Sequence, residues 1–174
     1  MKTIFEVKDI APTTLKEHVD VSTRITFASF LPDQVSHFID DLLAAANHFR
    51  DKGPLRIETD YDDIKQQLFV TLTGSLASAK LLAYKTENHD SLFSDEQETA
   101  ITVKIVPFPH PRSVSINDHI IAASKNHPQN DIPLVLDTRY DEDTEQFTLI
   151  FKGSFFATTY LLFLVAIRLT QARN

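Results

Sequence analysis

The sequence predicts an α+β protein: a tandem duplication of a strand-helix-strand-strand-helix unit, forming a mainly antiparallel sheet with helices packed on one face. Three observations lead to this prediction. The chain matches itself at a constant offset, its expected strands show alternating apolar residues, and the segments between them repeat apolar residues at helical spacing. With 174 residues, 43% of them hydrophobic and 24% charged, the chain can bury a core.

The internal match holds without a gap at an offset of 79 residues, the distance from Pro54 to Pro133. Identical pairs at this offset are Pro32/Pro111, Asn47/Asn126, His48/His127, Leu55/Leu134, Thr59/Thr138, Tyr61/Tyr140, Asp62/Asp141, Gln67/Gln146, Gly74/Gly153 and Ser75/Ser154. Composition alone would give roughly one identity in seventeen positions, so the match indicates duplication. We expect an N-terminal strand and connector at residues 1–20, repeat 1 at 21–88, a linker at 89–98 and repeat 2 at 99–174, with both repeats in one compact domain.

The elements of the first repeat follow from local patterns. A short strand contains Ile25 and Phe27, and Pro32 suits the first turn of the helix that follows. The apolar residues at three- and four-residue spacing in this helix are Leu31, Val35, Phe38, Ile39, Leu42, Leu43, Ala46 and Phe49. Alternating residues at 55–60 and 68–73 predict two strands joined by the polar hairpin 61–66, and Ser75 can cap a second helix. Residues 2–8 alternate enough to add an edge strand, and residues 10–20 form a connector.

The second repeat opens with a strand at residues 99–106 and has a shorter, less apolar first helix at 114–126. Its last helix, at 155–169, is apolar on nearly every face and must be covered all round. Either it is a central core helix or it forms a subunit interface, and on this ground we predict a homodimer. The expected interface residues are Phe155, Phe156, Tyr160, Phe163 and Ile167. A membrane span needs about 20 apolar residues, which this segment lacks.

Composition excludes several functional classes. The net charge of -7, with no local basic patch, argues against binding to nucleic acids or to a membrane surface. The absence of cysteine excludes disulfides and thiolate sites, and charged residues near Met1 do not resemble a signal peptide. We therefore expect a cytoplasmic protein. The only glycines, Gly53, Gly74 and Gly153, are too far apart for a phosphate-binding loop, so no cofactor is expected.

Signals for metal binding and catalysis are weak. None of the seven histidines has the spacing of a helical zinc site. His48 and His127 occupy equivalent positions, where a pair of site residues and favourable charges at helix ends are both possible. The acidic hairpins that contain Asp62 and Asp141 could hold a divalent cation, but solvated hairpin tips are the favoured interpretation. No nucleophile motif occurs, so we assign no catalytic or metal-binding residues.

The strongest candidate for a binding site is the proline-rich segment at residues 106–113. Its alternating prolines should hold an extended backbone that presents Phe108, His110 and Arg112 to a ligand, unless the segment is only a rigid connector. Tyr61 and Tyr140 adjoin the two acidic hairpins, where they could flank a shared groove or cover the hairpin ends. These five residues are the predicted ligand contacts.

The order of elements is similar to that of the duplicated small-molecule-binding domains of bacterial GyrI-like regulators and, more distantly, to the saddle of the TATA-binding protein. This resemblance implies a fold and carries no function. Three functions stay open. The favoured one is a noncatalytic module that binds a small ligand or a protein in a groove between the repeats. The others are an assembly protein acting through its last helix, and an enzyme using His110, Arg112 or the paired histidines with a carboxylate as acid and base.

Overall fold

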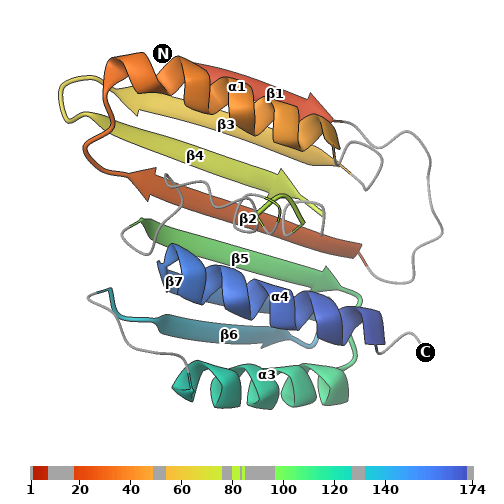
Figure 1. Cartoon of the computed structure of the whole chain (residues 1–174). Coiled ribbons are helices and arrows are strands. Elements are labelled where there is room, and N and C mark those ends of the chain that lie inside the picture. The colour runs from red at the N-terminus through yellow and green to blue at the C-terminus, as the bar shows by residue number, and fades with distance from the viewer. Residues whose placement is uncertain are drawn as a thin grey trace.

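The computed structural model describes residues 2–7, 18–48, 54–75, 80–82, 84, 97–126 and 132–171. It confirms the predicted α+β class, with a mainly antiparallel sheet and helices on one face. Seven strands form one antiparallel sheet in the order β1-β3-β4-β2-β5-β7-β6, and the helices pack on one face of it (Figure 1). Within the described ranges, none of the helices combines the length and the hydropathy that crossing a membrane requires.

The strands and helices follow the predicted order, with β1 added at the edge of the sheet beside β3. The first half of the chain contains β1 (Lys2–Val7), β2 (His18–Phe27), α1 (Pro32–His48), β3 (Leu55–Asp62) and β4 (Gln67–Gly74). Residues 80–82 and 84 are helical, and the rest of the second helix predicted for this half lies outside the described residues. The second half contains β5 (Glu98–Val106), α3 (His110–Lys125), β6 (Val135–Asp141), β7 (Gln146–Ser154) and α4 (Phe155–Gln171).

The two halves meet along β2 and β5, which pair in the middle of the sheet with Thr23 opposite Ile101. On one side of this central pair the order is β4 then β3, and on the other it is β7 then β6. The two outer hairpins also share a register, because Arg56 pairs with Thr73 and the residues 79 positions later, Val135 and Lys152, pair in the same way. This arrangement is what a duplicated unit would produce, and the duplication itself stays a prediction.

The correspondence between the halves changes by one residue before the hairpins. Phe30 and Phe108 donate the same kind of main-chain hydrogen bond to the following hairpin, and they lie 78 residues apart rather than 79. Helix α1 likewise begins at Pro32 and α3 at His110. The predicted equivalence of Pro32 with Pro111 is therefore wrong by one position. The second half has one more residue between the start of its helix and its hairpin.

Two predicted boundaries also need correction. Strand β2 begins at His18, inside the predicted connector, because the alternation of buried and exposed residues extends back to Val19. Helix α3 begins at His110 rather than at Val114, so the second part of the proline-rich segment is helical rather than extended. The physical reason is that Pro109 and Pro111 stand at the cap and in the first turn of the helix, where a missing N–H group costs no hydrogen bond.

The core lies between the sheet and the helices. Residues on the inner face of β2, β5 and β7 are fully buried: Val21, Ile25, Ile101, Val103, Ile105, Leu149 and Phe151. Helix α4 runs alongside β5 and β7 and packs against them, and its Leu161, Leu162 and Val165 are fully buried. Among its predicted interface residues, Phe155 is fully buried within the chain and Phe156 and Phe163 are partly buried, whereas Tyr160 and Ile167 are 45% and 49% exposed.

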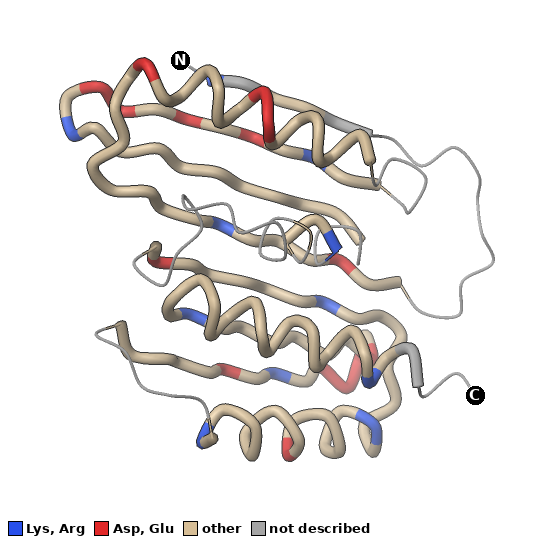
Figure 2. Tube along the Cα trace, in the orientation of Figure 1, with Lys and Arg blue, Asp and Glu red and all other residues tan. Residues whose placement is uncertain are grey.

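The other face of the sheet carries small polar and charged side chains, including Ser22, Thr71 and Thr102. Figure 2 shows basic residues on the central strands of this sheet, and the exposed ones are Arg24, Lys104 and Lys152. The guanidinium of Arg24 lies over the ring of Phe69 at 5.0 Å from its centroid. No described helix covers this face.

Candidate functional site

The loop after β2 and the loop after β5 are each hydrogen-bonded at two points to the hairpin that follows them. The Phe108 amide donates to the carbonyl of Glu145 at 2.8 Å, and the Tyr140 hydroxyl donates to the carbonyl of Phe108 at 2.8 Å. In the first half the equivalent bonds are Phe30 N–H to Gln66 O at 2.8 Å and Tyr61 O–H to Phe30 O at 2.7 Å. We call each pair of bonds the tyrosine clamp. Covering the hairpin end, one of the two roles considered for Tyr61 and Tyr140, thus takes the form of this clamp.

The acidic hairpins use their first aspartate to hold the turn. The Asp62 carboxylate accepts hydrogen bonds from the amides of Ile64 and Lys65, both at 3.1 Å. The Asp141 carboxylate accepts from the amides of Asp143 and Thr144 at 3.0 and 3.4 Å. Such bonds are a usual reason for aspartate at a turn. Within the part of the chain that the structure describes, no group of three or more His, Asp or Glu side chains is placed to hold a metal ion.

Four of the five predicted ligand contacts come together where α3 begins. The rings of His110 and Tyr140 meet edge to face at 4.9 Å between centroids. The guanidinium of Arg112 lies 4.7 Å from the centroid of the Phe108 ring, which is fully buried and stacks on Phe147 at 5.6 Å. Phe108 therefore supports the loop from within the core and does not reach the surface. The fifth residue, Tyr61, belongs to the clamp of the other half.

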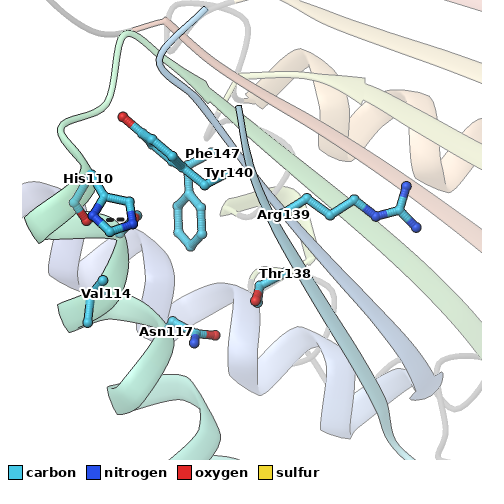
Figure 3. Close-up of a pocket in the computed structure, with 8 residues that line it drawn as sticks. His110, Val114, Asn117, Thr138, Arg139, Tyr140 and Phe147 are labelled. Carbon is cyan, nitrogen blue, oxygen red and sulfur yellow. Dashed lines mark hydrogen bonds between the residues drawn. The ribbon is translucent and has the colours of Figure 1, made fainter. Parts of the chain in front are cut away.

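Beside this cluster a pocket of about 190 Å³ opens between α3 and β6. Its lining residues are His110, Ser113, Val114, Asn117, Thr138, Arg139, Tyr140 and Phe147. Figure 3 shows Asn117 on α3 and the Thr138 hydroxyl on β6 facing each other across the gap between the two elements. The Arg139 side chain extends away from the pocket (Figure 3), and its guanidinium contacts the Asp137 carboxylate at 2.8 Å.

The hydrogen-bonding groups of the pocket are not all used. The Ser113 hydroxyl donates to the main-chain carbonyl of His110 at 2.6 Å, and the Tyr140 hydroxyl is held in the clamp. The Oδ1 atom of Asn117 is buried and has no hydrogen-bond partner among the residues that the structure describes. A buried acceptor without a partner costs free energy. Asn117 therefore borders the pocket while its Oδ1 atom is closed off from solvent.

The first half of the chain has apolar residues where the pocket has polar ones. At the offset of 78 that relates the two helices, Ser113 corresponds to Val35 and Asn117 to Ile39. Val35 and Ile39 are only 4% and 8% exposed and belong to the core cluster. The same helix-strand contact therefore has different side chains in the two halves. One packs it with aliphatic side chains, and the other leaves a polar pocket.

The surroundings of the pocket are acidic on the hairpin side. Burial raises the pKa of Tyr140, and the carboxylates of Glu145, Glu142 and Asp141 raise this pKa further. Burial likewise raises the pKa of Tyr61, together with Asp63, Asp33 and Asp62. Both phenols therefore stay protonated and able to donate in the clamp at neutral pH.

Sequence reasoning did not single out Ser113, Asn117 or Thr138 as site residues. Thr138 was noted only as an identical position of the repeat. The available signal was the low apolarity of the first helix in the second half. Comparing it with α1 at the correct offset would have located the two polar substitutions.

Other predicted features lie elsewhere. The ring of His48 stacks on Tyr84 at 5.5 Å between centroids, whereas its predicted counterpart His127 lies outside the described residues.

A second pocket, of about 140 Å³, lies on the open face of the sheet around Arg24, Glu58 and Asp60. Each of these two pockets draws its residues from one half of the chain, and the groove expected between the repeats stays a prediction.

No protein-family model matches this chain, and no curated protein sequence matches it.

Proposed function

We propose that this protein is a noncatalytic binding module that holds a small ligand in the pocket between α3 and β6. The observation that carries the proposal is the pocket itself, which is lined by Ser113 and Asn117 at positions where the other half has the core residues Val35 and Ile39. The first half shows that the fold can fill this contact with aliphatic side chains.

The size and composition of the pocket suit binding of a small molecule. About 190 Å³ is below the roughly 300–1,000 Å³ typical of drug-sized ligand sites. Val114 and Phe147 give the pocket apolar contact, while Ser113, Asn117 and Thr138 give it polar atoms at defined places. Polar groups at fixed positions beside apolar contacts are the usual basis of small-molecule specificity.

The test is a thermal-shift screen of small metabolites on the wild-type protein and on Asn117→Ile. A ligand of this pocket should raise the melting temperature of the wild type, because it binds only the folded state. The Asn117→Ile protein, which restores the residue type of the first half, should fold and show no such shift. Hits that stabilise both proteins equally would bind elsewhere, and a screen with only such hits would refute the proposal.

A homodimer formed through α4 is a second proposal, supported by a separate observation. Tyr160 and Ile167 are about half exposed and lie seven residues apart, which places them on one side of the helix two turns apart. Phe163 lies between them and is partly buried. Light scattering should give a dimer mass for the wild type and a monomer mass for Ile167→Glu, and a monomeric wild type would refute the dimer.

We also retain the cytoplasmic location as a proposal, supported by the cysteine-free composition that suits a reducing compartment. Cell fractionation with an antibody to the protein would test it.

A further inference from the structure

The edge of the sheet beside the pocket indicates what kind of ligand the pocket takes. We infer, on the basis of the proposed binding function, that the ligand is a short extended peptide that pairs with the free edge of β6 and places one uncharged side chain in the pocket. Three features support this inference: the free edge of β6, the strand that occupies the equivalent edge in the first half, and an exposed apolar side of α3.

Strand β6 is the last strand at its end of the sheet, and among the described residues it pairs only with β7 (Figure 1). In an antiparallel pair, alternate residues direct their N–H and C=O groups to the partner strand, and the residues between them direct theirs away. The outward groups of β6 therefore meet no strand in the part of the chain that the structure describes. Its residues, Val135–Asp141, include no proline that would interrupt this row. Such an edge is a template for a further strand.

The equivalent edge in the first half is occupied. Strand β3 corresponds to β6 at the offset of 79, and its outer edge pairs antiparallel with β1, from Lys2 opposite Asp60 to Val7 opposite Leu55. None of the described strands takes the place of β1 beside β6. The sheet thus has a strand position that is filled in one half and empty in the other.

The pairing of β1 also shows which side chains of an added strand face the helix. Phe5 lies opposite Ile57 and packs half-buried against the core, whereas its neighbour Ile4 is 53% exposed. Ile57 corresponds to Leu136 at the offset of 79. A peptide that pairs with β6 in the register of β1 therefore directs the side chains opposite Leu136 and Thr138 to the helix side. Because Thr138 lines the pocket, the side chain opposite Thr138 enters it.

The side of α3 that faces past β6 is apolar and exposed. On the other side of this helix, His119 contacts Arg168 of α4 at 3.0 Å, and α4 packs on β5 and β7, toward the middle of the sheet. Val114 and Ile121 lie roughly opposite His119 at about 3.6 residues per turn, and they are 45% and 37% exposed. A strand added beside β6 can cover these two side chains, which favours its binding.

The pocket suits one side chain of such a peptide. Its volume of about 190 Å³ is small for a whole ligand, and its rings and aliphatic groups come from His110, Val114, Tyr140 and Phe147. None of the lining residues is an Asp or a Glu, and the Arg139 side chain extends away (Figure 3). A charged side chain would lose hydration here without gaining a counter-charge. We therefore expect an aromatic or aliphatic side chain.

The two parts of the site would act together. When a peptide adds a strand to a sheet edge, the main-chain hydrogen bonds give affinity and the pockets for alternate side chains give specificity. A small molecule that fills only the pocket lacks the bonds to β6. We expect it to bind more weakly than a peptide that carries the same group.

The probe is the acetylated and amidated hexapeptide Glu-Phe-Lys-Val-Thr-Val, titrated by calorimetry into the full chain at neutral pH. In the register of β1, its Phe lies opposite Thr138, and its Lys and Glu lie opposite Asp137 and Arg139, so the cross-strand charges are of opposite sign. Replacing the Phe of the peptide with Asp should weaken binding by roughly tenfold or more, because the charge enters the pocket without a partner.

Backbone methylation of the peptide tests the pairing itself. One probe is methylated on the nitrogens of its second and fourth residues, and the other on those of its third and fifth. One of the two should lose binding and the other keep it, because only alternate N–H groups face β6. Equal affinities of the two methylated peptides would overturn the strand pairing.

Hydrogen exchange locates the peptide on the chain. Without peptide, alternate amides of β6 should exchange rapidly, and at saturation they should be protected. The amides of β1, at the other end of the sheet, should stay unchanged. Protection on β1 and none on β6 would overturn the inference. Protection of all β6 amides in the free chain would also overturn it, because the edge would already be covered by another copy or by the chain itself.

Three variants test the contribution of the pocket. Asn117→Ile, which gives the pocket the residue type of the first half, should weaken the peptide by roughly tenfold or more. Ser115→Ala changes an exposed residue of the same helix and should leave the affinity unchanged. If folding of Asn117→Ile is impaired, Val114→Asp at a 45% exposed position provides a second variant, which should also weaken the peptide.

The outcomes distinguish the peptide class from the function itself. Equal binding of the peptide to the wild type and to the pocket variants would overturn the inference. Metabolites whose binding depends on Asn117, with none by the peptide, would overturn the inference and leave the pocket as a small-molecule site. If neither the peptides nor the metabolites depend on Asn117, the proposed function fails together with the inference.

Discussion

Tyr140 donates its phenolic hydrogen to the main-chain carbonyl of Phe108 at 2.8 Å, across 32 positions of sequence. Tyr61 makes the equivalent bond to Phe30 at 2.7 Å in the first half. In each half this bond ties the loop before the helix to the outer hairpin and so sets where the helix begins relative to the sheet. In the second half the same bond places His110 and the first turns of α3 beside the pocket.

The two tyrosine clamps should contribute similarly to stability. We expect Tyr61→Phe and Tyr140→Phe to lower the free energy of unfolding by similar amounts, because each removes one hydrogen bond and leaves one carbonyl without its donor. The clamps lie in separate hairpins, so the double variant should lose the sum of the two. Urea unfolding measures all three losses. A loss in only one half would show that the clamps are not equivalent.

The raised pKa of both tyrosines predicts a loss of stability at high pH. In the unfolded chain tyrosine titrates near pH 10, and in the fold the pKa of Tyr61 and Tyr140 is raised above 10.0. Their contribution is therefore fully present below about pH 10 and is lost as pH rises through the raised folded values.

This pH effect can be separated from other groups that titrate in the same range. The fall in urea midpoint above about pH 10 should be shallower for the Tyr61→Phe, Tyr140→Phe double variant than for the wild type. In the native wild type, part of the tyrosinate absorbance should appear at higher pH than in the unfolded chain. Identical slopes for the two proteins would contradict the assigned pKa shifts.

The two strand-ending glycines should differ in their tolerance of a methyl group. A Cβ on Gly74 would lie 2.2 Å from the carbonyl oxygen of Pro54, a backbone atom that cannot move away easily. A Cβ on Gly153 would meet the Leu134 side chain at 3.2 Å, which can adjust. We expect Gly74→Ala to cost about 1–3 kcal/mol of unfolding free energy and Gly153→Ala to change it by less than about 1 kcal/mol. Equal effects in urea unfolding would contradict this difference.

Thr23 offers a site for stabilisation. Its hydroxyl is buried at the central strand pair and has no hydrogen-bond partner within the described residues. Thr23→Val removes this polar atom and should raise the free energy of unfolding by about 1 kcal/mol. Thr158→Val is the matched control, since the Thr158 hydroxyl donates to the Ser154 carbonyl at 2.9 Å and its loss should destabilise by about 1 kcal/mol. Destabilisation by both variants, measured by urea unfolding, would show that the Thr23 hydroxyl has a partner.

Most of the sheet could be predicted because its signals are local. The alternation around Ile57 and Val70 defines a strand, its side chains and their faces within a few residues. Turn-forming residues such as Asp62 mark where one strand ends and the next begins. The start of α3 was missed because prolines suit both an extended segment and a first helical turn. Only the contacts that His110 and Arg112 make in the fold decide between an extended segment and a helical turn.

The candidate site could be predicted only in part. The sequence pointed to His110 in the proline-rich segment and to Tyr140 beside a hairpin as separate features. It did not indicate that the two side chains are in contact. Asn117 and Thr138 lie on different elements, and no local pattern relates them. Their juxtaposition depends on the helix start and on the one-residue difference between the halves, which the gapless match concealed.

The sequence by itself determined the α+β class, the paired hairpins and the positions of the two clamp tyrosines, because alternation, turn residues and internal similarity are encoded over short stretches of chain. The tertiary structure decided that α1 packs with buried aliphatic side chains in one half, whereas a pocket lies between α3 and β6 in the other. Whether Ile39 fills a gap or Asn117 borders one depends on the distance between a helix and a strand edge. That distance is set by the packing of the whole sheet against its helices.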